Sequence, residues 1–206
     1  TVESGRFDWG QNDKFPGLSQ PDQAYHGVTF AETFGDFGFT MKMRAVALRD
    51  YGPSMAAMAA WNLLQGVETL PLRMERHCSN AQAVAEFLEA HPKVGWVSYS
   101  GLRSSPYYDL GKKYLPKGAG AVFTFGLKGG YKAGIKVVNA VEMFSHLANI
   151  GDTRSLIIHP ASTTHRQLSE EQHIGAGAGP DVVRLSVGIE TIDDIIADLD
   201  QALATV

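Results

Sequence analysis

The run DVVRLSVGIE, residues 181–190, decides the fold of the carboxy-terminal part of this chain. Val183, Leu185 and Val187 recur with the two-residue period of a β-strand, so they share one face. Arg184 points to the opposite face and directly follows two valines in the sequence. This alternation predicts a half-buried strand with a positive charge in its middle.

A guanidinium group cannot lose its proton in a protein, so a partly buried Arg184 needs an anionic partner. Two interpretations are open at this point. The simpler one is an internal ion pair with an Asp or Glu side chain. The other is a bidentate clamp for the carboxylate or phosphate of a ligand.

Outward from this strand, the pattern alternates between strands and helices. Further strands are expected at 94–99, 121–127 and 155–158, and helices at 131–148, about 169–173 and from Thr191 onward. The last helix opens with an imperfect capping box, Thr191 with Asp194. Strands with helices between and after them predict an α/β layer domain over residues 70–206.

The front of the chain reads differently. Residues 1–37 are rich in turn signals, and Thr1 and Val2 resemble the end of a strand. Three helices are then predicted, at about 40–50, from Pro53 to Gly66, and up to His91. The third helix has an apolar stripe that would face a core, made of Leu70, Met74, Cys78, Ala81, Ala85 and Leu88.

The bulk composition is that of a globular protein with a real core. Hydrophobic residues make up 44% of the 206 residues, and charged residues make up 19%. A net charge of −4 without a basic stripe argues against a nucleic-acid surface, and no apolar run approaches membrane-spanning length. A single cysteine and the absence of a signal-peptide pattern favour a reducing, cytoplasmic location.

Several residue groups invite chemistry but have simpler explanations. The seven histidines show no metal-binding spacing, so no metal site is expected. The run GAGAGP, residues 175–180, enters a strand rather than a helix and is read as a loop, not a phosphate-binding turn. The acidic residues of the last helix are expected on its solvated face, and these are Asp193, Asp194, Asp198 and Asp200.

The segment NIGDTRSLIIHPASTTHRQLSEEQ, residues 149–172, places polar groups just past a predicted strand. Asn149 closes a helix there, and Thr164 follows the strand. Ordinary turn capping explains both residues. The functional alternative is that Asn149, Thr164 and Arg184 converge on one small anionic ligand.

Taken with the run VVRLSVGIETIDDIIADLDQAL, residues 182–203, this segment resembles the carboxy-terminal half of the Cys/Met metabolism enzymes that depend on pyridoxal phosphate (PLP), of fold type I. The resemblance covers essentially the whole chain. It implies the end of the large PLP-binding domain with connecting helices over 1–69. It also implies a small α/β domain over 70–206, whose mainly antiparallel sheet is flanked by helices.

Within the family, the run FGDFGFTMKMRAVALRDYGPSMAAMAAWNLLQGVETLPLRMERHC, residues 34–78, is most similar to O-acetylhomoserine sulfhydrylases. The resemblance implies that acetate on O-acetyl-L-homoserine is replaced by sulfide, which gives homocysteine for methionine biosynthesis. Two alternatives stay open. One is a sibling of the cystathionine γ-synthase or methionine γ-lyase type, and the other is a non-catalytic fragment.

The resemblance also assigns site residues. The arginine of the RLSVG motif binds the substrate α-carboxylate in this family, and here it is Arg184. The family's SLG motif lies at the same carboxylate and corresponds here to Asn149 and Ile150. Asparagine in place of serine leaves the detailed role of this position open. The threonine of the HPA…TH motif lines the pocket and is Thr164.

The cofactor-binding (Schiff-base) lysine of the family precedes SGRFDW, residues 4–9, so the resemblance implies that it is absent from this chain. No catalytic residue is therefore expected here. The chain is expected to work with an amino-terminal portion that holds most of the PLP contacts, and the family's usual assembly is a homotetramer.

Overall fold

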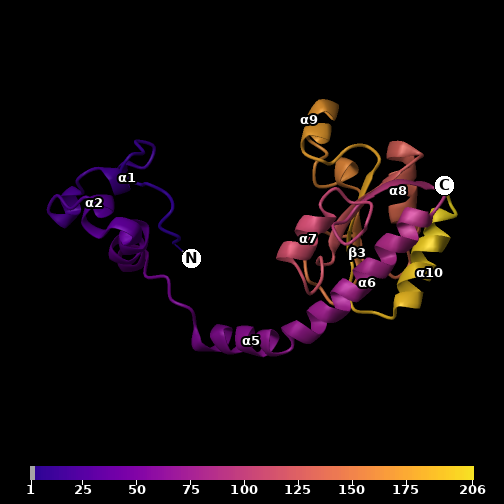
Figure 1. Ribbon diagram of the computed structural model, residues 1–206, viewed down its shortest axis with the longest axis horizontal. Helices are drawn as coiled ribbons and strands as arrows, with labels where there is room; N and C mark the ends of the chain where they lie inside the picture. The colour runs from indigo at the N-terminus through magenta and orange to yellow at the C-terminus, as the bar shows by residue number, and fades with distance from the viewer. Residues whose placement is uncertain (1–2) are drawn as a thin grey trace. The chain divides into compact units, whose positions relative to one another are not determined.

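The computed structural model describes residues 3–206, so the strand end predicted at Thr1 and Val2 lies outside the described residues. The chain forms two compact units, Thr1–Leu64 and Gln65–Val206, each described by itself below (Figure 1). The division predicted at 69 and 70, between the tail of a large PLP-binding domain and a small α/β domain, stays a prediction.

The second unit is built around a four-stranded sheet. Its strands are β1 (Val94–Ser98), β2 (Val122–Leu127), β3 (Leu156–Ile158) and β4 (Val182–Ser186). They lie in the order β1-β2-β4-β3, and every neighbouring pair is antiparallel. The antiparallel α/β domain expected from the sequence is therefore confirmed, with each strand within about a residue of its predicted bounds.

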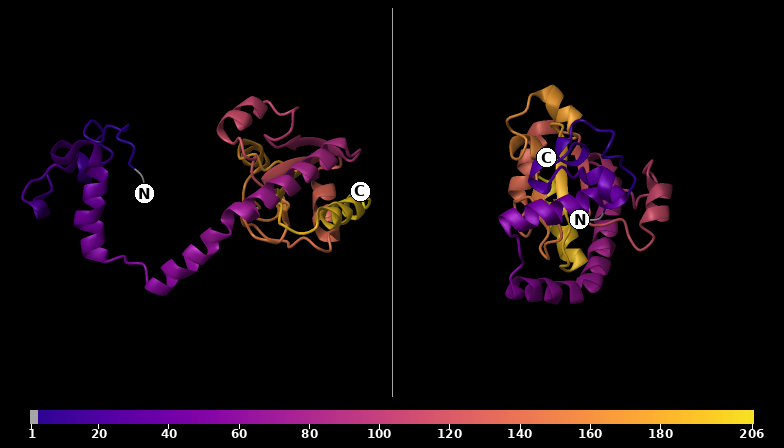
Figure 2. Two further views of the ribbon diagram at one scale, coloured as in Figure 1. Left: turned by 60° about the horizontal axis from the view of Figure 1, so that its bottom comes forward. Right: turned by 90° about the vertical axis from the view of Figure 1, so that its left-hand side faces the viewer.

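Three helices of this unit cover one face of the sheet (Figures 1 and 2). The helices of the unit are α6 (Leu70–Ala90), α7 (Tyr108–Tyr114), α8 (Gly130–Ala140), α9 (Glu170–Gly175) and α10 (Ile192–Leu203), with a 3-10 turn η4 (Pro160–Ser162). Helices α6, α8 and α10 supply one continuous apolar core together with Phe123, Phe125, Val183 and Leu185 of the sheet. Burial of this apolar surface is the main stabilising term of the unit.

The apolar stripe predicted for α6 is only half right. Ala81, Ala85 and Leu88 are fully buried, but Leu70 and Met74 are 40% and 36% exposed. The core of the unit covers the helix only from about His77 onward, so the earlier apolar side chains find no cover within residues 65–206. Cys78, expected to be buried, is half-buried and has a free thiol.

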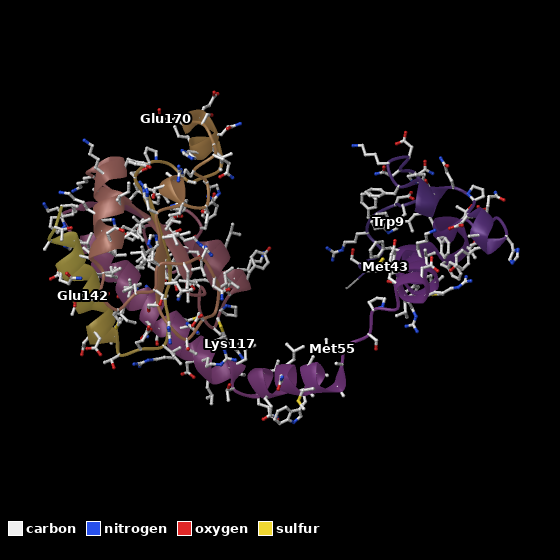
Figure 3. The ribbon with its side chains drawn as sticks, turned by 180° about the vertical axis from the view of Figure 1, so that it is seen from behind. Trp9, Met43, Met55, Lys117, Glu142 and Glu170 are labelled. Atoms are coloured by element: carbon white, nitrogen blue, oxygen red, sulfur yellow. The ribbon has the colours of Figure 1, made fainter. Side chains whose placement is uncertain are left out.

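The helix predicted over 131–148 ends early, because α8 stops at Ala140. Asp198 of α10 accepts hydrogen bonds from the backbone N–H groups of Glu142, Met143 and Phe144 at 2.8, 2.9 and 3.2 Å. These amides can no longer continue a helix. Asp198 was expected on a solvated face, yet it is only 7% exposed. Glu142 lies beside α10 in Figure 3.

The first unit is built from helical segments, three of which abut from Gly38 to Tyr51 as the one helix that the sequence predicted at about 40–50. They are α1 (Pro16–Ser19), η1 (Gln23–Tyr25), α2 (Phe30–Phe34), η2 (Gly35–Phe37), α3 (Gly38–Lys42), the π-helix η3 (Met43–Leu48), α4 (Arg49–Tyr51) and α5 (Ala57–Glu68). Aromatic rings pack among them, with Trp9 stacked on Phe39 at a centroid distance of 5.4 Å. Helix α5 runs through Gly66, where the sequence predicted its end.

No helix in the described part of the chain is long and apolar enough to cross a membrane.

Candidate functional site

Arg184 occupies the middle of β4, a strand with a neighbour on each side. Its Cα partners are Thr124 on β2 and Ile158 on β3. Two ladders of backbone hydrogen bonds therefore fix its main chain. Val183 and Leu185 are completely buried on the helix-covered face. The side chain of Arg184 is half-buried on the opposite face.

The guanidinium of Arg184 has no acidic partner in its own unit. No Asp or Glu carboxylate of residues 65–206 lies within 4.0 Å of it. Its single hydrogen bond within the unit runs from Nη2 to the carbonyl oxygen of Asn149 at a long 3.5 Å. The internal ion pair that the sequence left open is therefore not formed within this unit. A half-buried cation without an anion is suited to bind one.

Asn149 lies beside Arg184 in the connection between α8 and β3. Its carbonyl oxygen faces the guanidinium, and its side-chain Oδ1 accepts from the N–H of Ile150 at 2.9 Å. That contact orients the side-chain amide group, which keeps two donors for a ligand. The structure thus brings Asn149 and Arg184 together. Ile150 is 71% exposed and has no apolar cover within residues 65–206.

Thr164 follows η4, the turn that packs against β4. Its side chain is exposed, and its Oγ1 is hydrogen-bonded to Nδ1 of His165 at 2.9 Å. No direct hydrogen bond joins Thr164 to Arg184 or Asn149 in residues 65–206. The convergence of all three side chains on one ligand therefore stays a prediction.

His159 ties the end of β3 to the segment that enters β4. It is 1% exposed, its Nε2 donates to the carbonyl of Pro180 at 2.9 Å, and its Nδ1 is paired with Ser162 Oγ at 2.9 Å. The ring of Tyr131 lies edge-on to it at 5.0 Å. Burial lowers the pKa of His159, although the bond to Pro180 opposes this effect. A neutral imidazole is therefore favoured at this position.

Two carboxylates anchor the α8–β3 connection, and neither role was expected from the sequence. Asp198 holds residues 142–144 at one end, as described above. At the other end, Glu190 accepts from the N–H of Ser155 at 2.6 Å and from its hydroxyl at 2.9 Å. Asp198 carried a readable signal, since it shares the apolar stripe of α10 with Ile195, Leu199 and Ala202. Glu190 carried no such signal.

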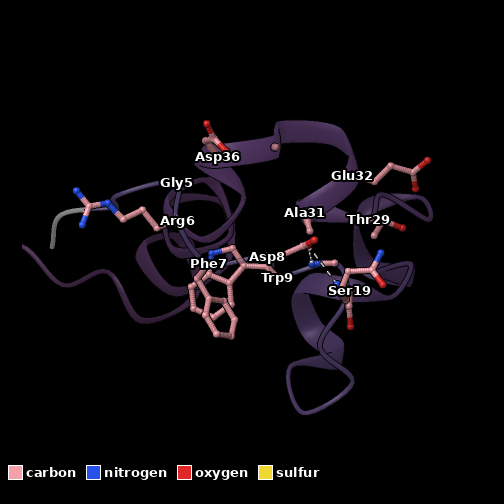
Figure 4. A pocket seen from close by; sticks show the side chains of 13 residues that line it. Gly5, Arg6, Phe7, Asp8, Trp9, Ser19, Thr29, Ala31, Glu32 and Asp36 are labelled. Carbon is pink, nitrogen blue, oxygen red and sulfur yellow. Dashed lines mark hydrogen bonds between the residues drawn. The ribbon is translucent and has the colours of Figure 1, made fainter.

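The first unit has a separate hollow of about 490 Å³, which is lined by none of Asn149, Thr164 and Arg184 (Figure 4). Its lining includes Phe7, Asp8, Trp9 and Asp36. One oxygen of Asp8 already accepts from the N–H groups of Gly10 and Gln11, at 3.0 and 3.3 Å. The chain itself therefore uses part of the polar capacity of this hollow.

The described residues offer little for holding a metal or PLP directly. Among residues 3–206, no cluster of three His, Cys, Asp or Glu side chains is arranged to bind a metal. Every lysine except Lys42 is exposed, and Lys42 pairs with Asp22. These lysines do not form an enclosed cofactor site, and Arg184, which has no carboxylate partner in residues 65–206, is the cation best suited to bind an anion.

Comparison with known sequences decides the family. The profile described as "Cys/Met metabolism PLP-dependent enzyme" matches residues 18–204. The chain belongs to this family. Members depend on PLP, so the family expected from the sequence motifs is confirmed.

Similar proteins of the Cys/Met metabolism family are named as homocysteine synthases or O-acetylhomoserine sulfhydrylases. The homocysteine synthase of Schizosaccharomyces pombe is 53% identical over 203 residues, which cover 98% of this chain and 47% of the relative. The O-acetyl-L-homoserine sulfhydrylase of Leptospira meyeri is 50% identical over 214 residues, which cover 100% of this chain and 48% of the relative. The chain thus spans about half the length of the curated relatives it matches.

A solved family member confirms the fold class. It is described as an O-acetylhomoserine (thiol)-lyase from Campylobacter jejuni, and it contains N'-pyridoxyl-lysine-5'-monophosphate. The superposition has a TM-score of 0.81 at 43% identity, and it covers 94% of this chain and 46% of the other. The chain therefore has the fold of part of a PLP-dependent Cys/Met metabolism enzyme.

Proposed function

We propose that this chain is the carboxy-terminal, substrate-binding portion of a PLP-dependent O-acetyl-L-homoserine sulfhydrylase. The reaction replaces the acetate group on Cγ of O-acetyl-L-homoserine with sulfide and gives homocysteine and acetate. The names and identities of the relatives from Schizosaccharomyces pombe and Leptospira meyeri support this activity. The proposal places the protein in methionine and homocysteine biosynthesis.

One observation carries the site assignment, namely that Arg184 is half-buried and that its guanidinium has no carboxylate partner in residues 65–206. We assign it to the α-carboxylate of the amino-acid substrate. Two parallel N–H donors of a guanidinium match the two oxygens of a carboxylate and fix its plane as well as its position. Such a fixed plane orients the bonds at Cα of the substrate, which proximity effects in catalysis require.

The neighbouring residues complete the substrate side of the site. Asn149 would donate its side-chain amide to the same carboxylate, since its Oδ1 is turned toward Ile150. Thr164 and Ile150 would line the pocket around the substrate. When bound, PLP supplies an electron sink for the bonds at Cα and Cβ. The role of this chain is to hold and orient the substrate.

The catalytic lysine and most PLP contacts are proposed to lie in an amino-terminal portion of the same enzyme. The much greater length of the relatives supports this division. A homotetramer in the cytoplasm is proposed from the family resemblance, and the single cysteine fits a reducing compartment.

The test uses the full-length, PLP-loaded enzyme and compares Arg184→Ala with the wild type. We expect kcat/KM for O-acetylhomoserine and sulfide to fall. The corresponding loss of transition-state stabilisation should be roughly 2–5 kcal/mol, the range for removing one partner of a buried charged pair. Arg184→Lys should fall between the two, because lysine keeps the charge but loses the bidentate fork.

Arg103→Ala is the matched control, because Arg103 is exposed in the loop after β1. Its kcat/KM should match that of the wild type. An unchanged kcat/KM in Arg184→Ala would remove the assignment. Higher activity of the wild type with cysteine as the thiol donor, or with methionine as the substrate, would instead indicate a cystathionine γ-synthase or methionine γ-lyase.

A further inference from the structure

The loop that carries Asn149 has little support of its own. Residues 146–151 are all exposed, and the loop joins α8 to β3 without regular secondary structure. Arg184, by contrast, is held by strands on both sides. The position of Asn149 against Arg184 therefore depends on how this loop is attached to the segment that carries Arg184.

The carboxy-terminal end of the loop is attached to the turn that directly follows β4. Ser155 is fully buried, and both its N–H and its hydroxyl donate to the carboxylate of Glu190. The Oγ of Ser155 in turn accepts from the N–H of Gly188 at 2.9 Å. A backbone bond from Ile189 N–H to the carbonyl of Thr153, at 3.0 Å, closes the connection. These residues form what we call the Glu190 lock: Thr153, Ser155, Gly188, Ile189 and Glu190.

Glycine at position 188 is required by this close packing. A Cβ atom there would lie 2.3 Å from Oε2 of Glu190 and 2.4 Å from the carbonyl oxygen of Thr153. Both distances are far below van der Waals contact. The loop and the turn therefore approach each other as closely as the backbone allows.

Helix α6 holds the other side of the same turn. Nδ1 of His77 donates to the carbonyl of Val187 at 2.7 Å, and Nδ2 of Asn80 donates to the carbonyls of Gly188 and Glu190 at 3.1 and 2.9 Å. Both side chains are 1% exposed. The turn is thus fixed to a long helix. Because the Glu190 lock bonds the loop to this turn, the loop is held in place by the same helix.

We propose that Glu190, acting through Ser155, is a positioning residue that places Asn149 against Arg184 so that both meet one substrate carboxylate. This inference rests on the proposed function. Because Glu190 lies in the same segment as Arg184, the lock ties the loop to the strand that bears the guanidinium. Binding residues must be held within roughly 0.5 Å of their productive geometry, and such locks provide that precision.

The experiment uses the full-length, PLP-loaded enzyme and two variants, Glu190→Gln and Ser155→Ala. We expect KM for O-acetylhomoserine to rise roughly tenfold or more in each, because small displacements of binding groups have effects of this size. The turnover number kcat should change much less. Preference for O-acetylhomoserine over its α-carboxamide should shrink, since the lock acts on carboxylate recognition.

Asp198→Asn is the matched control. It also weakens a carboxylate that binds backbone amides of the α8–β3 connection, but these amides, of residues 142–144, make no hydrogen bond to the turn after β4. It should lower the thermal unfolding midpoint at least as much as Glu190→Gln does. Its KM for O-acetylhomoserine, and its preference for that substrate over the α-carboxamide, should stay close to those of the wild type. Equal KM increases in Asp198→Asn and Glu190→Gln would overturn the proposal, because loop order in general would then be responsible.

The outcomes separate the two proposals. A wild-type enzyme without sulfhydrylase activity would remove the proposed function and this inference with it. An active wild type with unchanged KM and discrimination in Glu190→Gln and Ser155→Ala would overturn the positioning role alone. Testing both variants keeps the result decisive if one of them does not fold.

Discussion

The two faces of strand β4 differ in what their side chains contact. On one face, Val183 and Leu185 are completely buried against the helices of the core. On the other, Arg184 is half-buried and lacks a carboxylate partner in residues 65–206. One short strand thus separates two roles by alternation alone: one face stabilises the fold, and the other carries the charge that we propose binds the substrate carboxylate.

The largest expected effect on stability lies on the core face. Leu185→Ala should reduce the free energy of unfolding by roughly 2–5 kcal/mol, through lost burial and the cavity that remains. The measurement is the midpoint of urea unfolding, with Leu185→Met as a volume-conserving control that should cost less than about 1.5 kcal/mol. A Leu185→Ala protein as stable as the wild type would contradict the assignment of this face to the core.

A smaller effect is expected at His159, which is as buried as the core although it is polar. Burial lowers its folded-state pKa below the unfolded value of about 6.5, so the unfolded chain binds more protons at mildly acidic pH. Stability should therefore fall as the pH drops through 6.5 toward the folded-state pKa, and it should be independent of this group above that range.

The measurement is the urea midpoint of wild type and His159→Asn at several pH values between about 8 and 5. The variant should be less stable at neutral pH but should lose less of its stability on acidification. Identical pH dependence in the two proteins would show that His159 does not titrate on unfolding.

The strands were predictable because their side chains obey a simple rule. In β2 and β4, Phe123, Phe125, Val183 and Leu185 recur at every second position, and all four are buried on the face that the helices cover. Arg184 stood out for the same reason, since a charge broke an apolar pattern. Whether Arg184 has a carboxylate partner, however, is decided by residues distant in sequence, and a local pattern cannot predict these contacts.

Other features escaped prediction because long-range contacts decided them. Helix α8 ends where Asp198 binds the amides of residues 142–144, and that carboxylate comes from a helix far along the chain. Thr191 makes no side-chain capping bond, although its spacing to Asp194 suggested one. The Glu190–Ser155 contact likewise joins residues whose separation carries no periodic signal.

The smallest effect is expected at Ser186, which shares the face of Arg184 but is only 3% exposed. Its hydroxyl has no hydrogen-bond partner in the structure. Removing an unpaired buried hydroxyl should be nearly neutral or slightly stabilising, so Ser186→Ala should change the unfolding free energy by less than about 1 kcal/mol. KM for O-acetylhomoserine should also stay constant; a clear increase would mean that more of this face than Arg184 binds substrate.

The order of the sheet, β1-β2-β4-β3, has a consequence for how the protein is made. The strand that comes last in sequence is inserted between two that come earlier, so β2 and β3 wait with open edges until residues 182–186 leave the ribosome. Pairings between such distant segments close slowly. Arg184 is therefore placed in the sheet only after β2 and β3 have been made, and the sheet cannot close before its own strand arrives.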